Sequence, residues 1–501
     1  MKFFGREAQL DDLLGLWGKR VGSLVTCRGR RRIGKSTLIA RFAERSKARF
    51  VKLEGLRPQP GYTNEDELAA FATQLSAQTG SERTPPADWY SAFIRLDREI
   101  CDGERTVVLI DEISWFGHYD RTFADYVKIA WDNHWKKHDR LIVVLCGSVS
   151  GWIRENIVDN GAFLGRRSLD MIVRELPLAD CAKFWGAAAQ RIDAREIADV
   201  LSVTGGVPRY LEEIDPGTSA AENIRRMAFR ANGLLRTDFD EMFTDVVTRQ
   251  PRLSGKALRA LAGAPLSVSE LAAALRMERG GKLSSALVEL EEAGFVEPDD
   301  GKNPATGESA RERRYRLKDN YARFYLRYVE PVKAEIDAGA YSFASLAALD
   351  GWESVMGLAF ENLVVNNWPQ LLKPLHLDAA QVVSAAPWRR AGSRKATRKK
   401  PGRGGKRKTA RGGAREKADR KGVQVDLLLQ TRRSLCVVEI KRQREIGRDV
   451  IDEVAEKVRR IPRRDGTSVR TALVYEGALA PIVEADGYFD AIVPFRRLLG
   501  V

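Results

Sequence analysis

Long apolar runs are absent from this chain of 501 residues. A helix that crosses a bilayer needs about 20 consecutive apolar residues, and no run approaches that length. The opening residues, MKFFGREAQL, also lack the apolar core that is typical of a signal peptide. The sequence therefore predicts a cytoplasmic protein that is not embedded in a membrane.

Cysteine and histidine are scarce, with five cysteines and four histidines in the whole chain. Neither set has the close spacing of a metal site or a redox motif. Two of the cysteines, Cys27 and Cys146, lie in apolar runs that are typical of buried strands. This distribution argues against a disulfide framework and favours a reducing compartment.

Acidic residues are outnumbered by basic ones, and the net charge is +15. The excess is local, because sixteen lysines and arginines lie between Arg389 and Lys421 against two acidic residues, Glu416 and Asp419. This segment contains no apolar residue larger than alanine, so we predict a disordered basic insert over residues 389–421. Such a segment attracts DNA phosphates without sequence preference, and the alternative is a solubilising loop that has no partner.

A phosphate-binding loop is predicted after the first apolar strand, LVTC. Gly29, Gly34, Lys35 and Ser36 fit the spacing G-x-x-x-x-G-K-[ST], and the helix-like stretch TLIARFAER follows. The backbone amides of such a loop surround phosphates, the lysine reaches the β and γ phosphates, and the serine binds magnesium. The predicted ATP-binding residues are Gly29, Arg30, Arg31, Arg32, Ile33, Gly34, Lys35, Ser36 and Thr37. The three arginines add positive charge near the phosphates, or else face outward.

Two further apolar strands end in polar residues that suit ATP hydrolysis. TVVLIDE ends in Asp111 and Glu112, which we predict to hold magnesium and to orient or deprotonate the attacking water. LIVVLC is followed by Ser148, which is either a sensor of the γ-phosphate or an ordinary turn residue.

These motifs resemble those of prokaryotic, archaeal-type AAA-related and signal-transduction P-loop ATPases. FFGREAQLDDL, FLGRRS and TGGVPRYLEEI extend the resemblance. It implies that the opening segment lies near the adenine and that Arg209 lies in a nucleotide-sensing lid. It also implies that Arg166 completes the site of a neighbouring copy, in a homo-oligomer formed through the nucleotide sites. The alternatives are a surface charge at Arg166 and a helix-breaking turn at GGVP.

The middle of the chain has the pattern of three short helices and a hairpin, which is typical of a winged helix. The third helix, at about residues 282–293, would enter a DNA groove in such a domain. Glu289, Glu291 and Glu292 oppose phosphate there, so domain packing or contact with a protein is at least an equal alternative. The segment YRLKDNYARFYLRYVEP, residues 315–331, resembles the linker helix of a group of archaeal and bacterial ATPases, and its aromatic residues favour a core position.

That ATPase group ends in a domain that resembles restriction endonucleases, and this chain has the corresponding order of residues. A helix carries Glu361, a strand carries Asp426, and a hairpin leads to VVEIKR with Glu439 and Lys441. Converging carboxylates can hold magnesium, and a lysine can position water or stabilise the phosphate. We predict Asp426 and Glu439 as catalytic metal ligands, Lys441 as the catalytic lysine and Glu361 as an outer ligand. Val425 stands where the motif has proline.

The expected organisation is an α/β multidomain protein with ATP and Mg²⁺ as cofactors. Residues 1–175 would form the P-loop ATPase core with a parallel sheet, and residues 176–250 a helical lid. Residues 251–335 would form the winged helix and linker helix, and residues 336–501 the nuclease-like α/β domain. The predicted function is an ATPase whose nucleotide state controls a nuclease-like domain acting on DNA. The alternative is an ATP-dependent switch or DNA-binding regulator whose nuclease-like tail does not cut.

Overall fold

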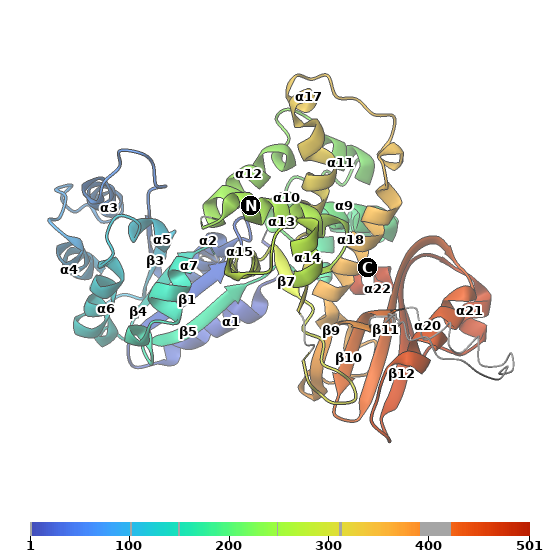
Figure 1. Cartoon of the computed structure of the whole chain (residues 1–501). Coiled ribbons are helices and arrows are strands. Elements are labelled where there is room, and N and C mark those ends of the chain that lie inside the picture. The colour runs from blue at the N-terminus through green and yellow to red at the C-terminus, as the bar shows by residue number, and fades with distance from the viewer. Residues whose placement is uncertain (1–2, 101–102, 149–150, 248, 310–312, 391–421) are drawn as a thin grey trace, which may run out of the picture.

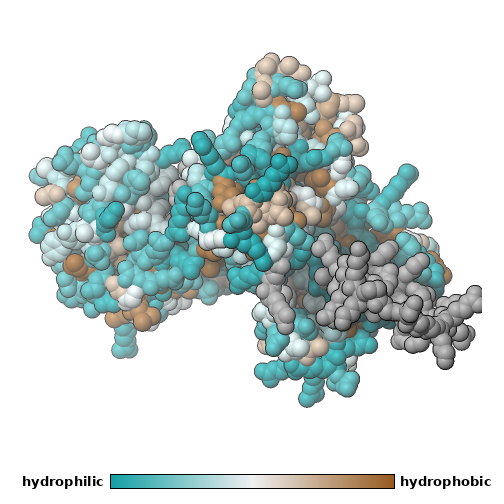
Figure 2. Space-filling view, in the orientation of Figure 1, coloured by the Kyte–Doolittle hydropathy of each residue, from teal (hydrophilic) through white to brown (hydrophobic). Residues whose placement is uncertain are grey.

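Two five-stranded sheets lie on opposite sides of a mainly helical centre (Figure 1). The computed structural model describes residues 3–100, 103–148, 151–247, 249–309, 313–390 and 422–501. Hydrophilic residues dominate the face shown in Figure 2, with hydrophobic residues scattered among them. None of the helices in these ranges is long and apolar enough to cross a membrane.

The N-terminal sheet is parallel throughout and has the strand order β2-β3-β4-β1-β5. Its strands are β1 (Ser23–Gly29), β2 (Arg49–Glu54), β3 (Thr106–Asp111), β4 (Leu141–Gly147) and β5 (Arg167–Val173). Both faces are covered, which explains the continuous apolar runs in the central strands. The prediction of a parallel α/β sheet is confirmed, while β2 and β5 were not predicted.

Alternating side chains of this sheet pack against different helices. Val107 and Leu109 share a core with α1 and α2, whereas Val108 and Ile110 share a core with α3, α4 and α6. These helices and two short ones are α1 (Glu7–Gly15), α2 (Lys35–Arg45), α3 (Asn64–Thr79), α4 (Trp89–Ile100), α5 (Ile113–Phe116), α6 (Phe123–Asn133) and α7 (Gly151–Ile153). The sheet is therefore the middle layer of three.

The helical centre begins with α8 (Leu178–Ala182), α9 (Ala194–Thr204), α10 (Pro208–Leu211), α11 (Ala220–Ala228) and α12 (Leu234–Val246). A smaller unit follows, with α13 (Pro251–Gly263), β6 (Leu266–Ser267), α14 (Val268–Ala274), α15 (Gly281–Glu292), β7 (Val296–Pro298) and β8 (Arg314–Leu317). The three strands form an antiparallel sheet in the order β6-β8-β7. Its identity as a winged helix stays a prediction.

Helix α15 packs against its neighbours in this chain. Glu289 is buried and accepts a hydrogen bond of 2.8 Å from the backbone of Arg249, and Glu292 pairs with Arg154 of the ATPase part. These contacts favour domain packing over DNA reading as the role of α15.

The linker segment is part of the core, as predicted. It comprises α16 (Asn320–Phe324) and a following π-helical turn over Tyr325–Val329. Tyr321, Phe324, Tyr325 and Tyr328 are all buried. The helices α17 (Lys333–Asp337) and α18 (Trp352–Asn366) then lead to the second large sheet.

The C-terminal sheet is mixed, with the order β13-β12-β11-β10-β9. Neighbouring strands are antiparallel from β9 to β11 and parallel from β11 to β13. Its elements are β9 (Val382–Arg390), β10 (Val423–Thr431), β11 (Ser434–Ile446), α20 (Asp449–Arg460), β12 (Ser468–Leu479), α21 (Pro481–Ala485), β13 (Ala491–Pro494) and α22 (Phe495–Leu499). The predicted mixed α/β domain is confirmed at this level, and its nuclease-like identity stays a prediction.

Alternate side chains of strand β11 pack against different helices. Val438 and Ile440 share a core with α18, whereas Val437 shares a core with α20. Because side chains alternate along a strand, Glu439 and Lys441 lie on the α20 side. The next residue, Arg442, lies on the other side.

The basic insert starts later than predicted. Arg389 and Arg390 are the last residues of β9, because they pair with Gln424 and Val423 of β10. The predicted start at residue 389 is therefore wrong by two residues. Residues 391–421 lie outside the described part of the chain, so their predicted disorder stays a prediction.

Candidate functional site

The phosphate-binding loop joins β1 to α2 and is held in a tight path. A Cβ atom at Gly29 would lie 2.4 Å from the carbonyl oxygen of Val173 on β5, so a larger residue does not fit there. Gly34 has φ of +85°, a left-handed conformation that favours glycine. Lys35 donates hydrogen bonds to the carbonyl oxygens of Gly29, at 3.1 Å, and Arg30, at 3.3 Å. The side chain of Lys35 thus lies across the phosphate-binding loop.

Two carboxylates at the end of β3 face this loop in different electrostatic settings. Asp111 accepts a hydrogen bond of 2.6 Å from Ser36, and Lys52 lies 3.2 Å from the same oxygen. Burial raises the pKa of Asp111, but the Ser36 hydrogen bond and the Lys52 charge outweigh it and hold that pKa below its usual value. Burial raises the pKa of Glu112, against the opposing charge of Lys35. Ser36 and Asp111 together offer the oxygen ligands that Mg²⁺ prefers.

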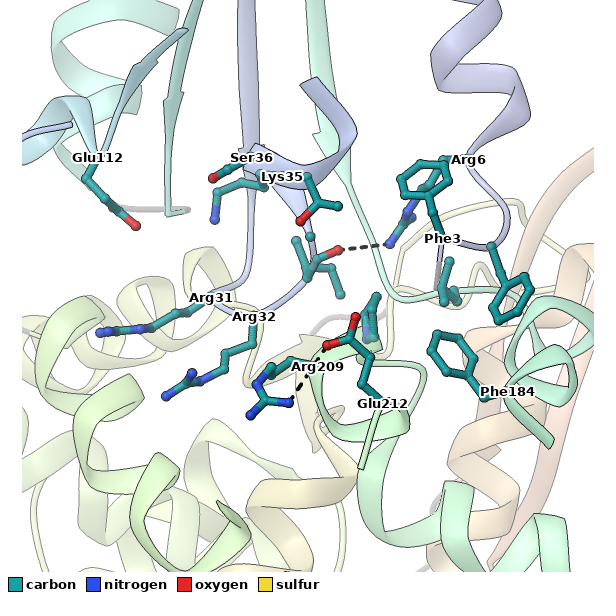
Figure 3. A pocket seen from close by; sticks show the side chains of 16 residues that line it. Phe3, Arg6, Arg31, Arg32, Lys35, Ser36, Glu112, Phe184, Arg209 and Glu212 are labelled. Carbon is teal, nitrogen blue, oxygen red and sulfur yellow. Dashed lines mark hydrogen bonds and ion pairs between the residues drawn. The ribbon is translucent and has the colours of Figure 1, made fainter. Parts of the chain in front are cut away.

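A pocket of about 260 Å³ adjoins the loop (Figure 3). Figure 3 shows Glu112 on one side, Phe3 and Phe184 on the other, and Lys35 and Ser36 between them. The lining residues are Phe3, Phe4, Arg6, Arg31, Arg32, Ile33, Gly34, Lys35, Ser36, Thr37, Glu112, Leu176, Phe184, Pro208, Arg209 and Glu212. One end is therefore aromatic and the other is charged.

The opening segment of the chain reaches the aromatic end of this pocket. Phe4 packs edge-to-face on Phe184, with ring centroids 5.0 Å apart, and Arg6 donates a hydrogen bond of 3.2 Å to the carbonyl oxygen of Ile33. These contacts are compatible with the predicted place near the adenine. Phe184 lies far from the motifs in sequence, and no local signal could have found it. Glu212 lies within the quoted TGGVPRYLEEI motif, and its position there was the available signal.

Most predicted ATP-binding residues line the pocket, and three do not: Gly29, Arg30 and Ser148. Asp111, the predicted magnesium ligand, is also absent from the lining. Ser148 is buried at the end of β4. Its sensor role stays a prediction.

Arg30 points away from the pocket and into the helical centre. Its guanidinium lies 2.7 Å from Asp319 and 3.4 Å from Glu175. The side chain of Arg30 is 10% exposed and that of Asp319 is 1% exposed. Arg32 lines the pocket but also pairs with the buried Asp238 of α12. Two loop arginines therefore connect the ATPase part to the residues that follow it.

The two arginines that the resemblance named are both ion-paired within the chain. Arg209 lines the pocket and lies 2.6 Å from Glu213. Arg166 makes two hydrogen bonds to Asp132, at 2.8 and 3.0 Å, and does not line the pocket. Its predicted action on a neighbouring copy stays a prediction.

The C-terminal sheet brings the predicted carboxylates next to lysines. Lys457 of α20 donates to both oxygens of Glu439, at 2.7 and 2.6 Å, and Lys441 lies 2.9 Å from the same carboxylate. Glu453 bridges the two lysines, at 2.8 Å from Lys441 and 2.9 Å from Lys457. Sequence reasoning missed Glu453 and Lys457, although their spacing of four residues on a helix was the available signal.

Asp426 and Glu361 extend this cluster toward the neighbouring strand and helix. Asp426 accepts a hydrogen bond of 2.9 Å from the backbone of Ile440. Burial and the charge of Glu361 raise the pKa of Asp426 to about 6. Among the described residues, however, no three Asp, Glu, His or Cys side chains form a group that could hold a metal ion. Lys457 and Lys441 hold the carboxylate of Glu439 in this arrangement, and the metal-ligand roles of Glu361, Asp426 and Glu439 stay predictions.

A protein-family comparison matches the N-terminal part of the chain, and a sequence comparison finds one curated relative. Residues 3–214 match a family described as an ATPase domain predominantly from Archaea. An uncharacterized protein of Methanocaldococcus jannaschii is 23% identical over 364 residues, which cover 72% of this chain and 76% of that protein.

Two solved structures align with the chain at low similarity. A Walker-type ATPase of Pyrococcus abyssi has a TM-score of 0.49 and 16% identity, with 65% of this chain and 96% of that one covered. The ORC2 protein of Aeropyrum pernix, solved with ADPNP and ADP, has a TM-score of 0.41 and 15% identity, with 67% and 94% covered. The family match and the loop geometry together support a P-loop ATPase domain in residues 3–214.

Proposed function

We propose that this chain is an ATP-hydrolysing switch whose nucleotide state controls a C-terminal nuclease-like domain that acts on DNA. The observation that carries this proposal is the buried ion pair of 2.7 Å between Arg30 of the phosphate-binding loop and Asp319. A loop that closes around phosphates is thereby tied to the segment that leads to the C-terminal sheet.

The residues of the pocket suit hydrolysis of the γ-phosphate. Lys35 exchanges the carbonyl oxygens of its own loop for the β and γ phosphates. Ser36 and Asp111 would hold magnesium, which supplies charge neutralisation of the phosphates. Glu112 orients the attacking water and accepts its proton, and its raised pKa favours proton acceptance.

A chain of hydrogen bonds continues from Asp319 to the helix that carries Glu361. Asp319 caps α16 by accepting from the backbone of Ala322 at 3.0 Å. The next residue, Asn320, donates to the carbonyl oxygen of Ala359 on α18 at 3.0 Å, and Asn362 donates to Asn320 at 2.8 Å. Asn362 is adjacent to Glu361, whose charge acts on Asp426. The contacts connect the Asp319 segment to α18, and the proposal is that nucleotide binding biases this connection.

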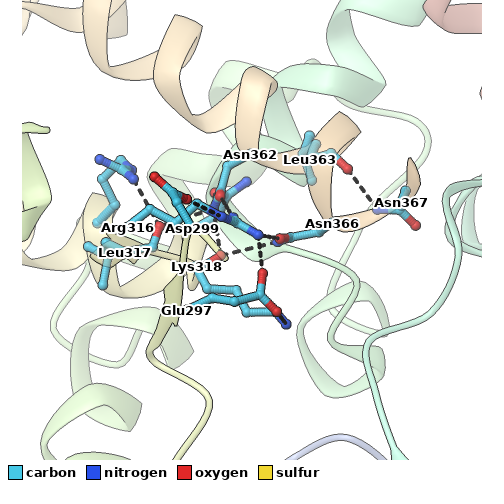
Figure 4. A network of polar contacts seen from close by, with 11 residues as sticks. Glu297, Asp299, Arg316, Leu317, Lys318, Asn362, Leu363, Asn366 and Asn367 are labelled. Carbon is cyan, nitrogen blue, oxygen red and sulfur yellow. Dashed lines mark hydrogen bonds and ion pairs between the residues drawn. The ribbon is translucent and has the colours of Figure 1, made fainter. Parts of the chain in front are cut away.

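Arg316 reinforces this connection at its centre (Figure 4). It donates to Asn362, to Asn366 at 2.9 Å and to Glu297. Asn362 also donates to the carbonyl oxygen of Leu317 at 3.2 Å. These hydrogen bonds therefore hold strand β8 against α18.

Replacing Asp319 with asparagine tests the connection. Asparagine caps a helix about as well as aspartate, so the variant removes the charge partner of Arg30 and keeps the cap. In the wild type, we expect a non-hydrolysable ATP analogue to change hydrogen exchange in α18. In Asp319→Asn, we expect that change to be lost, while the dissociation constant of the nucleotide stays within about threefold.

Asp300→Asn is the matched control, because Asp300 is exposed and pairs with Arg313 at the surface. It should respond to nucleotide as the wild type does. An α18 response that persists in Asp319→Asn contradicts control through this pair.

A DNA-binding switch whose C-terminal site does not cut is the second candidate. Lys457 favours this second candidate, because its ammonium group donates hydrogen bonds to both carboxylate oxygens of Glu439. Removal of these contacts would leave Glu439 buried and without that cation, which costs stability.

A plasmid assay distinguishes the two candidates. We expect the wild type to nick supercoiled plasmid in Mg²⁺ and ATP, and we expect Asp426→Ala to reduce nicking to background. Asp465→Ala, which changes an exposed aspartate of the same domain, should nick normally. Absence of nicking with every divalent ion and nucleotide tested would leave the second candidate.

A further inference from the structure

A second polar cleft, of about 780 Å³, lies between the small antiparallel sheet and the C-terminal sheet. Its volume is in the range of about 300 to 1,000 Å³ that is typical of ligand sites. One side carries Glu270, Asp299 and Arg314, and the other carries Arg389, Arg390 and Gln424. It shares no lining residue with the nucleotide pocket.

Three side chains of this cleft have buried polar atoms without a hydrogen-bond partner in the described part of the chain. They are both carboxylate oxygens of Asp299 and the Nε atoms of Arg314 and Arg389. The side chain of Asp299 is 7% exposed, and the nitrogen of its ion pair, Nε of Arg316, lies 3.8 Å away. Unpaired buried polar groups are costly. The cleft therefore suits a ligand that both donates and accepts hydrogen bonds.

The cleft adjoins the carboxylate cluster. Arg389 of β9 lies opposite Gln424 of β10, two residues before Asp426. Burial and the like charge of Arg314 lower the pKa of Arg389, and the opposite charges of Asp299, Glu361 and Asp426 act against that shift. A ligand that bound Arg389 would thus lie beside the cluster.

The surrounding sequence favours a polyanion as the occupant. The chain leaves the cleft at Arg390 and returns to it at Gly422, and both residues line it. The residues between them include fourteen lysines and arginines and two acidic residues. Such a concentration of positive charge attracts nucleic acid phosphates.

We propose that this cleft binds one unpaired nucleotide of a DNA strand beside the carboxylate cluster, with its phosphate on Arg314 and Arg389 and its base edge on Asp299. The inference rests on the proposed function, because the strand is the DNA on which the C-terminal domain acts. A carboxylate accepts two parallel hydrogen bonds, and guanine presents two adjacent N–H donors, at N1 and N2. The base must be unpaired, since these donors are used in a duplex. The cleft therefore prefers guanine in single-stranded DNA.

Fluorescence anisotropy of labelled oligonucleotides tests the site in the full chain. The probes are dT 12-mers with one central dG or, in its place, one inosine, which lacks the N2 amino group. Chelator is present and ATP is omitted, so neither cleavage nor hydrolysis enters the readout. We expect the wild type to bind the dG probe about tenfold more tightly than the inosine probe.

The variants separate base contact from phosphate contact. We expect Asp299→Asn to remove the preference for dG. We expect Arg389→Gln to weaken both probes about tenfold and to reduce the salt slope by about one. Arg389→Lys keeps the charge and should restore part of the affinity, which a folding defect would not allow.

Arg432→Gln is the matched control, because Arg432 is exposed on the turn at the far end of β10. It should change the affinity less than twofold. Equal binding of dG and inosine by the wild type, or wild-type affinity in Arg389→Gln, overturns the proposal. Binding of dGMP as tight as that of the dG probe also overturns the proposal, because the ligand would then be a free nucleotide. Failure to nick plasmid leaves these binding results unchanged, so the two proposals fail separately.

Discussion

Replacement of Lys35 by alanine lowers the rate of ATP hydrolysis by at least about a hundredfold, the scale on which loss of one preorganised charged donor acts. The ammonium group of Lys35 donates hydrogen bonds to two carbonyl oxygens of the phosphate-binding loop, at 3.1 and 3.3 Å. Phosphate release from a purified full-length chain, at saturating ATP, measures the effect.

Lys19→Ala is the control for this experiment, because Lys19 is exposed and does not line the pocket. It should hydrolyse ATP at the wild-type rate. Unchanged hydrolysis in Lys35→Ala would place the ATPase activity elsewhere and refute this site.

Replacement of Arg442 by methionine lowers the free energy of unfolding by about 3 to 5 kcal/mol, since one partner of a buried charge cluster is removed. Arg442 follows Lys441 on β11, and its side chain is 1% exposed. It lies 2.6 Å from Asp199 of α9 and 2.8 Å from Glu353 of α18. The variant therefore loosens the contact between the helical centre and the C-terminal sheet. Thermal and urea unfolding measure the loss.

The loss of unfolding free energy in Arg442→Met should depend on pH, because the buried carboxyl group of Glu476 lies near Arg442. Burial already raises the pKa of Glu476, which lies 4.0 Å from Arg442, to about 7. A carboxyl with a pKa higher in the folded than in the unfolded state takes up a proton on folding, so stability falls as pH rises from about 4.5 to 7. Without Arg442 this fall in stability with rising pH becomes steeper. The difference in unfolding free energy between the wild type and Arg442→Met should therefore be larger at pH 8 than at pH 5.

Arg444→Met is the matched control, because Arg444 is exposed on the same strand. It should change stability by less than about 0.5 kcal/mol. An equal loss in both variants, or a deficit that is independent of pH, would contradict the role assigned to Arg442.

The loop and the strand ends could be predicted because their determinants are local. The spacing of Gly34, Lys35 and Ser36 and the apolar run before Asp111 are properties of short segments. Strand β5 was missed because RSLDMIV is only partly buried at the edge of the sheet, so its apolar pattern is weak. Phe184 and Asp319 could not be assigned to a site, since nothing near them in sequence reports their long-range partners.

The sequence by itself determined the nucleotide-binding loop, the order of carboxylates and lysine in the C-terminal part, and the location of the positive charge. Each depends on residue identity at short spacing. Only the tertiary structure decided that Arg30 turns to Asp319, that Lys457 occupies Glu439, and that Asp299 and Arg389 face one cleft. These contacts join residues that are distant in the chain, and burial makes their charges depend on partners that no local pattern encodes.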